Sequence, residues 1–160
     1  MDGETFDEQD PVKLYVPKRE RREKFTIDAH APIGVFDSGV GGLTVVRELM
    51  RQIPDERMVY FGDTARLPYG AKSRDTIIRF SRQIVRFLKT KGVKAIVIAC
   101  NTASSHALKT LAEENDIPVI GVIYAGALSA VRATENGRIG VIGTRGTVSS
   151  EIYPKVIESL

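Results

Sequence analysis

From residue 32 onward, short apolar runs alternate with longer stretches whose apolar residues recur at helical spacing. The runs expected to form strands are 33–36, 57–61, 93–99, 118–123 and 138–142. The stretches expected to form helices are 43–52, 74–91, 102–115, 125–135 and one that begins at 149. Strands that are nearly continuously apolar and are separated by helices predict an α/β fold, in which helices cover both faces of a parallel sheet.

The first 31 residues follow neither pattern. An acidic start is followed by a mainly basic run at 18–24, and Pro11 and Pro17 interrupt the segment. A flexible, charged extension (1–31) ahead of one folded domain (32–160) is therefore expected, with a partner-binding arm as the alternative. The extension lacks the apolar centre of a signal peptide.

Composition and charge exclude several classes of partner. Hydrophobic residues make up 42% and charged residues 27%, as in ordinary globular domains. A net charge of +3 with few aromatic residues predicts no nucleic-acid partner, and the short apolar runs predict no membrane partner. Cys100 is the single cysteine, which rules out an intrachain disulfide and a multi-cysteine metal site and fits a cytoplasmic location.

Polar residues gather where the predicted strands end. In parallel α/β sheets, ligands bind beyond the carboxyl ends of the strands. These ends carry Asp37 and Ser38, Asp63, the run from Cys100 to Thr102, Tyr124, and Thr144. We therefore expect a site at this edge, with Asp37, Cys100 and Thr144 on one rim.

Cys100 is the most informative of these residues. It joins an apolar strand to a helix N-terminus, where unpaired N–H groups favour a nearby negative charge. The alternative is a buried cysteine that acts only as a small apolar residue. A nucleophilic thiol needs a histidine, but His30 lies in the extension and His106 is six residues into the helix, so a thiol base is favoured.

Three loops surround this position. The glycine-rich turn at 37–44 is neither a dinucleotide fingerprint nor a phosphate loop, and its glycines either form a tight turn or bring backbone N–H groups to a ligand. In the loop at 62–70, Tyr69 either closes over a ligand or packs. In the loop at 143–147, the threonines either hold a carboxylate or cap the next helix.

Four segments together, 33–44, 62–70, 99–104 and 143–147, resemble the glutamate racemases of the aspartate/glutamate racemase superfamily. They occur in the family's order and span residues 32 to about 150. The resemblance implies a two-domain racemase fold, of which residues 32–160 form the first α/β domain and end before the second. It also implies interconversion of L- and D-glutamate to supply peptidoglycan synthesis, by two cysteine thiols, with glutamate as the small-molecule partner and without metal, pyridoxal phosphate or another cofactor.

The resemblance also assigns roles to individual residues. Cys100 would be one acid/base thiol, assisted by Asp37. The residues that would contact or enclose the substrate are Asp37, Ser38, Pro68, Tyr69, Gly70, Asn101, Thr102, Thr144 and Thr147.

This chain departs from the family pattern at one point: it lacks the Gly-Cys-Thr-His motif that carries the second cysteine. The isolated chain is therefore expected to be inactive. The alternatives are a related racemase, such as one acting on aspartate, and a non-catalytic glutamate-binding module. Association into a homo-oligomer is left open.

Overall fold

The computed structural model describes residues 28–160 and contains a parallel sheet in the order β2-β1-β3-β4. The strands are β1 (Ile33–Asp37), β2 (Met58–Gly62), β3 (Ala95–Ile98) and β4 (Val119–Gly121). The α-helices are α2 (Leu43–Gln52), α3 (Arg74–Lys89), α4 (Asn101–Glu114), α5 (Ile123–Ala133), α6 (Arg145–Ser149) and α7 (Ile152–Glu158). Two short 3-10 turns, η2 (Thr64–Arg66) and η3 (Tyr69–Ala71), follow β2. The predicted parallel α/β sheet is confirmed.

The central strand β1 sets the register of the sheet. Val35 lies opposite Tyr60 of β2 and Val97 of β3, so the carboxyl ends of the three strands reach the same edge. Both β1 and β3 are nearly continuously apolar because their two faces are both covered.

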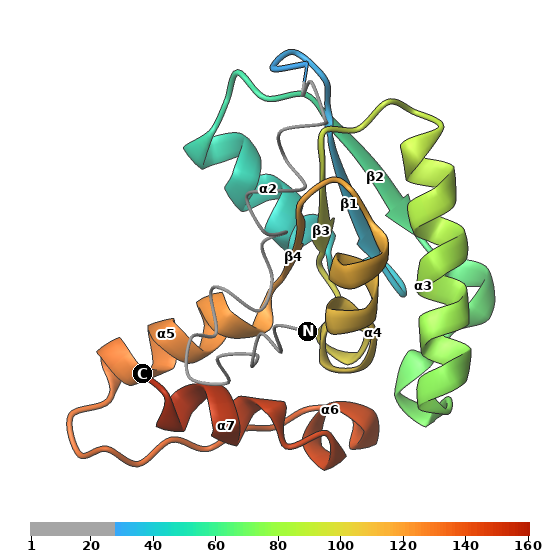
Figure 1. Ribbon diagram of the computed structural model, residues 1–160. Coiled ribbons are helices and arrows are strands. Elements are labelled where there is room, and N and C mark those ends of the chain that lie inside the picture. The colour runs from blue at the N-terminus through green and yellow to red at the C-terminus, as the bar shows by residue number, and fades with distance from the viewer. Residues whose placement is uncertain (1–27) are drawn as a thin grey trace, which may run out of the picture.

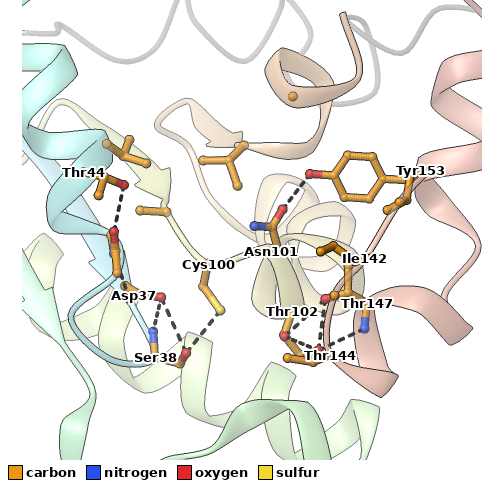
Figure 2. A pocket seen from close by; sticks show the side chains of 18 of the residues that line it. Asp37, Ser38, Thr44, Cys100, Asn101, Thr102, Ile142, Thr144, Thr147 and Tyr153 are labelled. Carbon is orange, nitrogen blue, oxygen red and sulfur yellow. Dashed lines mark hydrogen bonds between the residues drawn. The ribbon is translucent and has the colours of Figure 1, made fainter. Parts of the chain in front are cut away.

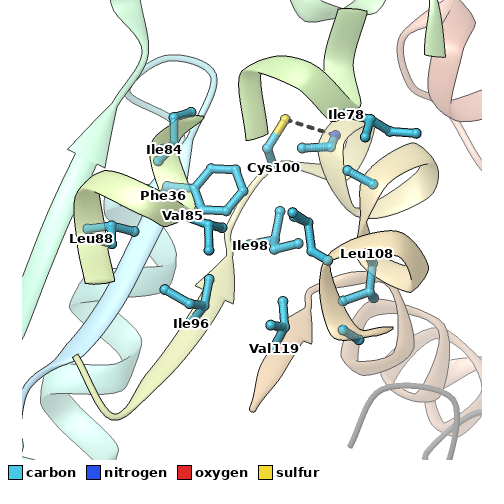
Figure 3. Close-up of a cluster of buried hydrophobic side chains, with 14 of the residues drawn as sticks. Phe36, Ile78, Ile84, Val85, Leu88, Ile96, Ile98, Cys100, Leu108 and Val119 are labelled. Atoms are coloured by element: carbon cyan, nitrogen blue, oxygen red, sulfur yellow. Dashed lines mark hydrogen bonds between the residues drawn. The ribbon is translucent and has the colours of Figure 1, made fainter. Parts of the chain in front are cut away.

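The two faces of the sheet are covered unequally. Alternate strand residues such as Phe36, Ile96 and Ile98 point toward α3 and α4 and form the main core with them (Figure 3). Residues of the opposite parity, including Val35 and Val97, face α2, none of whose residues is fully buried. Figure 1 shows α2 on one side of the sheet and α3 with α4 on the other.

The longest helix, α3, illustrates how local sequence sets an element. Ser73 caps it, because its Oγ accepts a hydrogen bond from the N–H of Thr76 at 3.3 Å. Asp75 in the first turn and Lys89 in the last complement the helix dipole. Its buried residues recur at helical spacing, as predicted, and this stripe packs on the sheet.

The expected fifth strand at residues 138–142 does not form, and this prediction is wrong. The sheet of the described part of the chain has four strands, and residues 138–142 form a loop between α5 and α6. The chain leaves the sheet along α5 and returns through this loop beyond the carboxyl ends of the strands (Figure 1). No strand formed by residues 28–160 lies beside the loop to share its hydrogen bonds, and Ile142 is 99% exposed.

The predicted extension falls almost entirely on residues 1–27, which lie outside the described residues. The last part of the segment, residues 28–31, contacts the domain. Lys94 Nζ donates to the carbonyl of Ala29 at 2.5 Å, and Arg57 donates to the carbonyl of His30 at 2.7 Å. The folded domain therefore includes residues just before Pro32. Among residues 28–160, no helix is both long and apolar enough to cross a membrane.

Candidate active site

A cavity of about 730 Å³ opens beyond the carboxyl ends of β1 and β3 (Figure 2). One side, here called the sheet wall, is formed by Asp37, Ser38 and Cys100. The opposite side, here called the outer wall, is formed by residues 139–144, Thr147 and Tyr153. Asn101 and Thr102, at the start of α4, lie between the walls. The structure thus brings Asp37, Cys100 and Thr144 to one cavity, the size of which suits a small ligand.

Asp37 ends β1, and its carboxylate is held by the backbone of the glycine-rich turn. Oδ1 accepts from the N–H of Ser38 at 2.7 Å, and Oδ2 accepts from the N–H of Gly42 at 2.9 Å. The residue is only 7% exposed. These bonds fix the carboxylate at the edge of the cavity, and they occupy the N–H groups of Ser38 and Gly42.

Cys100 lies directly across from Ser38. Its Sγ donates to Ser38 Oγ at 3.3 Å and accepts from the N–H of Ala103 at 3.4 Å, so the sulfur caps the N-terminus of α4. The thiol also contacts the main core, and the residue is 6% exposed. A thiolate at this position would have two donors available, one hydroxyl and one backbone N–H.

Three threonine hydroxyls meet where α4 and α6 approach each other. Thr102 Oγ1 is 2.9 Å from Thr144 Oγ1 and 3.3 Å from Thr147 Oγ1, and the last two are 3.1 Å apart. Thr144 also caps α6 by accepting from the N–H of Thr147. Of the two alternatives for these threonines, the helix cap is observed at Thr144, which also lines the cavity.

The segment from Pro68 to Gly70 lies behind this cluster and does not line the cavity. Tyr69 is 2% exposed, and its hydroxyl donates to the buried carboxylate of Asp63. Burial, together with that bond, raises the pKa of Tyr69 above its ordinary range. Gly70 abuts Thr144, since a Cβ at position 70 would lie 2.5 Å from Thr144 Cβ. Tyr69 therefore takes the packing role that the sequence left open.

Asp63 links this segment to the sheet wall. Its N–H donates to the carbonyl of Asp37 at 2.9 Å, while its side chain accepts from Tyr69 and from Arg66 Nε. The sequence marked Asp63 only as a strand end, and its role as a connection between the two loops depends on the fold.

His106 supports the outer wall and does not line the cavity. Burial lowers the pKa of its imidazole, although a hydrogen bond to the backbone of Gly146 opposes that shift. Gly146 lies between Thr144 and Thr147. The absence of a histidine from the cavity lining agrees with the expectation that Cys100 has no imidazole to activate it as a nucleophile.

Sequence reasoning missed two parts of the outer wall. The sequence predicts a strand at residues 138–142, and it assigns no role to Tyr153 within the helix expected from residue 149. Tyr153 reaches the cavity from α7, and its hydroxyl donates to Asn101 Oδ1 at 2.7 Å. Nothing in the local sequence around Tyr153 distinguishes it from a residue that packs.

The cavity offers a thiol, a fixed carboxylate, several hydroxyls and one primary amide. Within residues 28–160, no three His, Cys, Asp or Glu side chains gather in a way that could hold a metal ion. The arrangement is therefore suited to binding a small polar molecule beside a thiol and to proton transfer by that thiol.

The comparisons with known proteins agree with this geometry. Residues 33–160 match the model of the Asp/Glu/Hydantoin racemase family. A glutamate racemase from Oceanobacillus iheyensis is 56% identical over 128 residues, which are 80% of this chain and 47% of the relative.

Two solved structures are similar in fold as well as in sequence. A glutamate racemase isoform from Bacillus anthracis superposes with a TM-score of 0.79 at 50% identity, over 82% of this chain and 49% of that one. The Francisella tularensis glutamate racemase, solved in complex with D-glutamate, gives a TM-score of 0.72 at 47% identity, over 81% of this chain and 49% of that one. The chain thus spans about half the length of the relatives it matches. With this family match over most of its length, the chain belongs to the Asp/Glu/Hydantoin racemase family.

Proposed function

We propose that this chain supplies the first half of the active site of a glutamate racemase, with Cys100 as one of two acid/base thiols. The observation that carries the proposal is the common cavity that holds the Cys100 thiol, the fixed Asp37 carboxylate and the cluster of threonine hydroxyls. The similarity to glutamate racemases, one of them solved with D-glutamate bound, supports glutamate as the substrate.

Proton abstraction is the step assigned to Cys100. As a thiolate, its sulfur takes the α-proton, so that an S–H bond forms while the Cα–H bond breaks. The electron pair of the broken bond is delocalised into the adjacent carboxylate. The Ala103 N–H already donates to the sulfur, and the Ser38 hydroxyl, which accepts from the neutral thiol, can turn to donate to the thiolate; both then stabilise it before the transfer.

The other groups of the cavity hold the substrate. We assign the substrate ammonium to Asp37, because the Asp37 carboxylate lines the cavity and complements a positive charge. Two backbone N–H groups already hold this carboxylate in place. Thr102, Thr144 and Thr147 can turn their hydroxyls toward carboxylate oxygens, and Asn101 adds a donor. Pro68, Tyr69 and Gly70 shape the site indirectly, through the contact of Gly70 with Thr144.

Inversion requires a second acid on the opposite face of the α-carbon. By its resemblance to the family, a cysteine in a Gly-Cys-Thr-His motif supplies that proton in the complete enzyme. This chain has one cysteine, so the second thiol belongs to the part of the relatives that this chain does not match. Within this proposal the enzyme works in the cytoplasm, without a cofactor, and supplies D-glutamate for peptidoglycan.

The test is a chimera in which residues 1–160 are followed by the part of the Oceanobacillus iheyensis racemase beyond its matched segment. We expect the chimera to convert L- to D-glutamate, measured by polarimetry, and to introduce deuterium at Cα in deuterated water. Aspartate as a control substrate distinguishes a related racemase. A folded chimera that binds glutamate without turnover would favour a binding module.

The 160-residue chain alone provides the matched control. We expect it to show no racemisation and at most slow exchange of the α-hydrogen of one enantiomer, because a single base works on one face and half of the water-excluding site is missing. Robust inversion by the chain alone would refute the two-thiol mechanism.

A further inference from the structure

Tyr153 is joined to the first residue of α4 by a hydrogen bond that crosses the cavity edge. Its Oη donates to Asn101 Oδ1 at 2.7 Å, and the two residues are 52 positions apart in the sequence. Asn101 directly follows Cys100, so this bond links α7 to the reacting end of the sheet wall. Figure 2 shows the tyrosine ring reaching Asn101 from the α7 side.

The position of the tyrosine ring is well defined. Tyr153 packs against a small cluster in which Ile123, Ala127 and Val156 are buried. Gly126 leaves room for its hydroxyl, since a Cβ there would lie 3.1 Å from Tyr153 Oη. Burial raises the pKa of Tyr153, so the hydroxyl keeps its proton at neutral pH and remains a donor.

A primary amide has an acceptor end and a donor end, and the Tyr153 bond decides which end faces the ligand. Because Oδ1 accepts from the tyrosine, the amide nitrogen points away from the ring (Figure 2). Asn101 is exposed, so without this bond its amide could turn over and present oxygen instead. A nitrogen donor complements a carboxylate, whereas an oxygen would repel it.

We infer that Tyr153 is a positioning residue that fixes the Asn101 amide with its NH₂ group toward the ligand and so favours a carboxylate at that point of the cavity. The inference rests on the proposed function, since it assigns a partner to one carboxylate of glutamate. Tyr153 acts through Asn101 and does not itself need to touch the substrate.

The first test measures D-glutamate binding to the chimera described above by isothermal titration calorimetry. Tyr153→Phe keeps the ring and its packing and removes only the hydroxyl. We expect it to weaken binding about threefold to tenfold, the range of one neutral hydrogen bond. Tyr124→Phe, in the same cluster but outside the cavity lining, is the matched control and should stay within about twofold of wild type.

A double-mutant cycle separates positioning from a direct or structural effect. In an Asn101→Ala background, Tyr153→Phe should cause no further loss, because the amide through which it acts is gone. Side-chain amide NMR supplies a second measurement that does not depend on affinity: the order parameter of the Asn101 NH₂ group should fall in Tyr153→Phe, because the bond that fixes the orientation of the amide is gone.

The outcomes distinguish this inference from the proposed function. If the chimera without substitutions does not bind D-glutamate, the proposed function and this inference both fall. If it binds and Tyr153→Phe binds equally well, or if the two substitutions are additive, only the positioning role is overturned.

Discussion

The two walls of the cavity are built in different ways. In the sheet wall, Asp37 ends β1 and Cys100 lies two residues beyond the end of β3. The two residues are 7% and 6% exposed and accept hydrogen bonds from backbone N–H groups. In the outer wall, side-chain hydroxyls hold the loop and helices together, and Ile142 is 99% exposed. The group proposed to react is therefore on the rigid wall, and much of the proposed ligand recognition is on the more exposed one.

This difference has a physical reason. A base must be placed within a fraction of an ångström of the hydrogen it removes, and strands in a packed core hold a side chain more tightly than a loop does. Segments with few buried apolar contacts open more easily, which lets a ligand enter from that side. The following substitutions compare the walls, in order of decreasing expected effect.

The largest effect is expected at the reacting atom. In the chimera, Cys100→Ser should lower kcat by about 10²- to 10⁴-fold, the range that a positioned acid/base group contributes. The hydroxyl of serine is nearly isosteric with the thiol but is a far weaker acid. Polarimetry of glutamate measures the loss, and full activity of this variant would remove Cys100 from the mechanism.

Truncation of an apolar side chain should destabilise the protein more beneath the sheet wall than beneath the outer wall. Ile98→Ala, in the fully buried core beneath the sheet wall, should lower the free energy of unfolding by about 3–5 kcal/mol, because it leaves a cavity that cannot collapse. Ile157→Ala, in the partly buried cluster of α5 and α7, should cost only about 1 kcal/mol. Urea unfolding of both variants measures the difference, and equal losses would show that the walls are equally well packed.

Thr144 tests the outer wall more locally. Thr144→Val removes the hydroxyl that caps α6 and meets Thr102, and should cost about 1 kcal/mol of stability. In the chimera it should raise KM more than it lowers kcat, since the residue is proposed to bind and not to react. Thr144→Ser keeps the hydroxyl and is the control; if it behaves like the valine variant, the methyl group matters and the hydrogen bonds do not.

The smallest effect concerns pH. Burial lowers the folded-state pKa of His106, so the neutral imidazole is favoured in the folded chain. This contribution is present above the unfolded pKa of about 6.5 and is lost as the pH falls through the lower folded value. We expect the free energy of unfolding to fall between about pH 7 and pH 5 by less in His106→Gln than in wild type, as measured by urea titrations at each pH. An identical slope in the two proteins would contradict this assignment.

Much of the sheet could be predicted from local sequence. The strands 33–37 and 95–98 are buried on both faces, so their apolar runs are long and unambiguous. Residues 138–142 carry a similar local signal, yet they form a loop because strand formation also needs a hydrogen-bonded neighbour, which sequence alone does not reveal.

The candidate site also has residues that the sequence places correctly and residues that only the fold reveals. Asp37, Cys100 and Thr144 could be placed on one rim because parallel topology brings the strand ends together. Tyr69 could not be placed by its motif, since its burial depends on Asp63, six residues earlier, facing it in the folded loop. Tyr153 reaches the site from another helix. Its contact with Asn101 joins residues far apart in the sequence, so the residues around Tyr153 do not reveal it.

The last strand of the sheet, β4, has only three residues, and in the described part of the chain it pairs with β3 alone. Its Ile120 is 47% exposed. An unpaired strand edge can recruit strands from other molecules, and a very short edge offers few backbone groups to a growing fibril. Because β4 is so short, its edge is a poor template for strands of other molecules, although the exposed Ile120 is apolar. The length of β4 therefore protects the folded chain against amyloid-like aggregation at this edge.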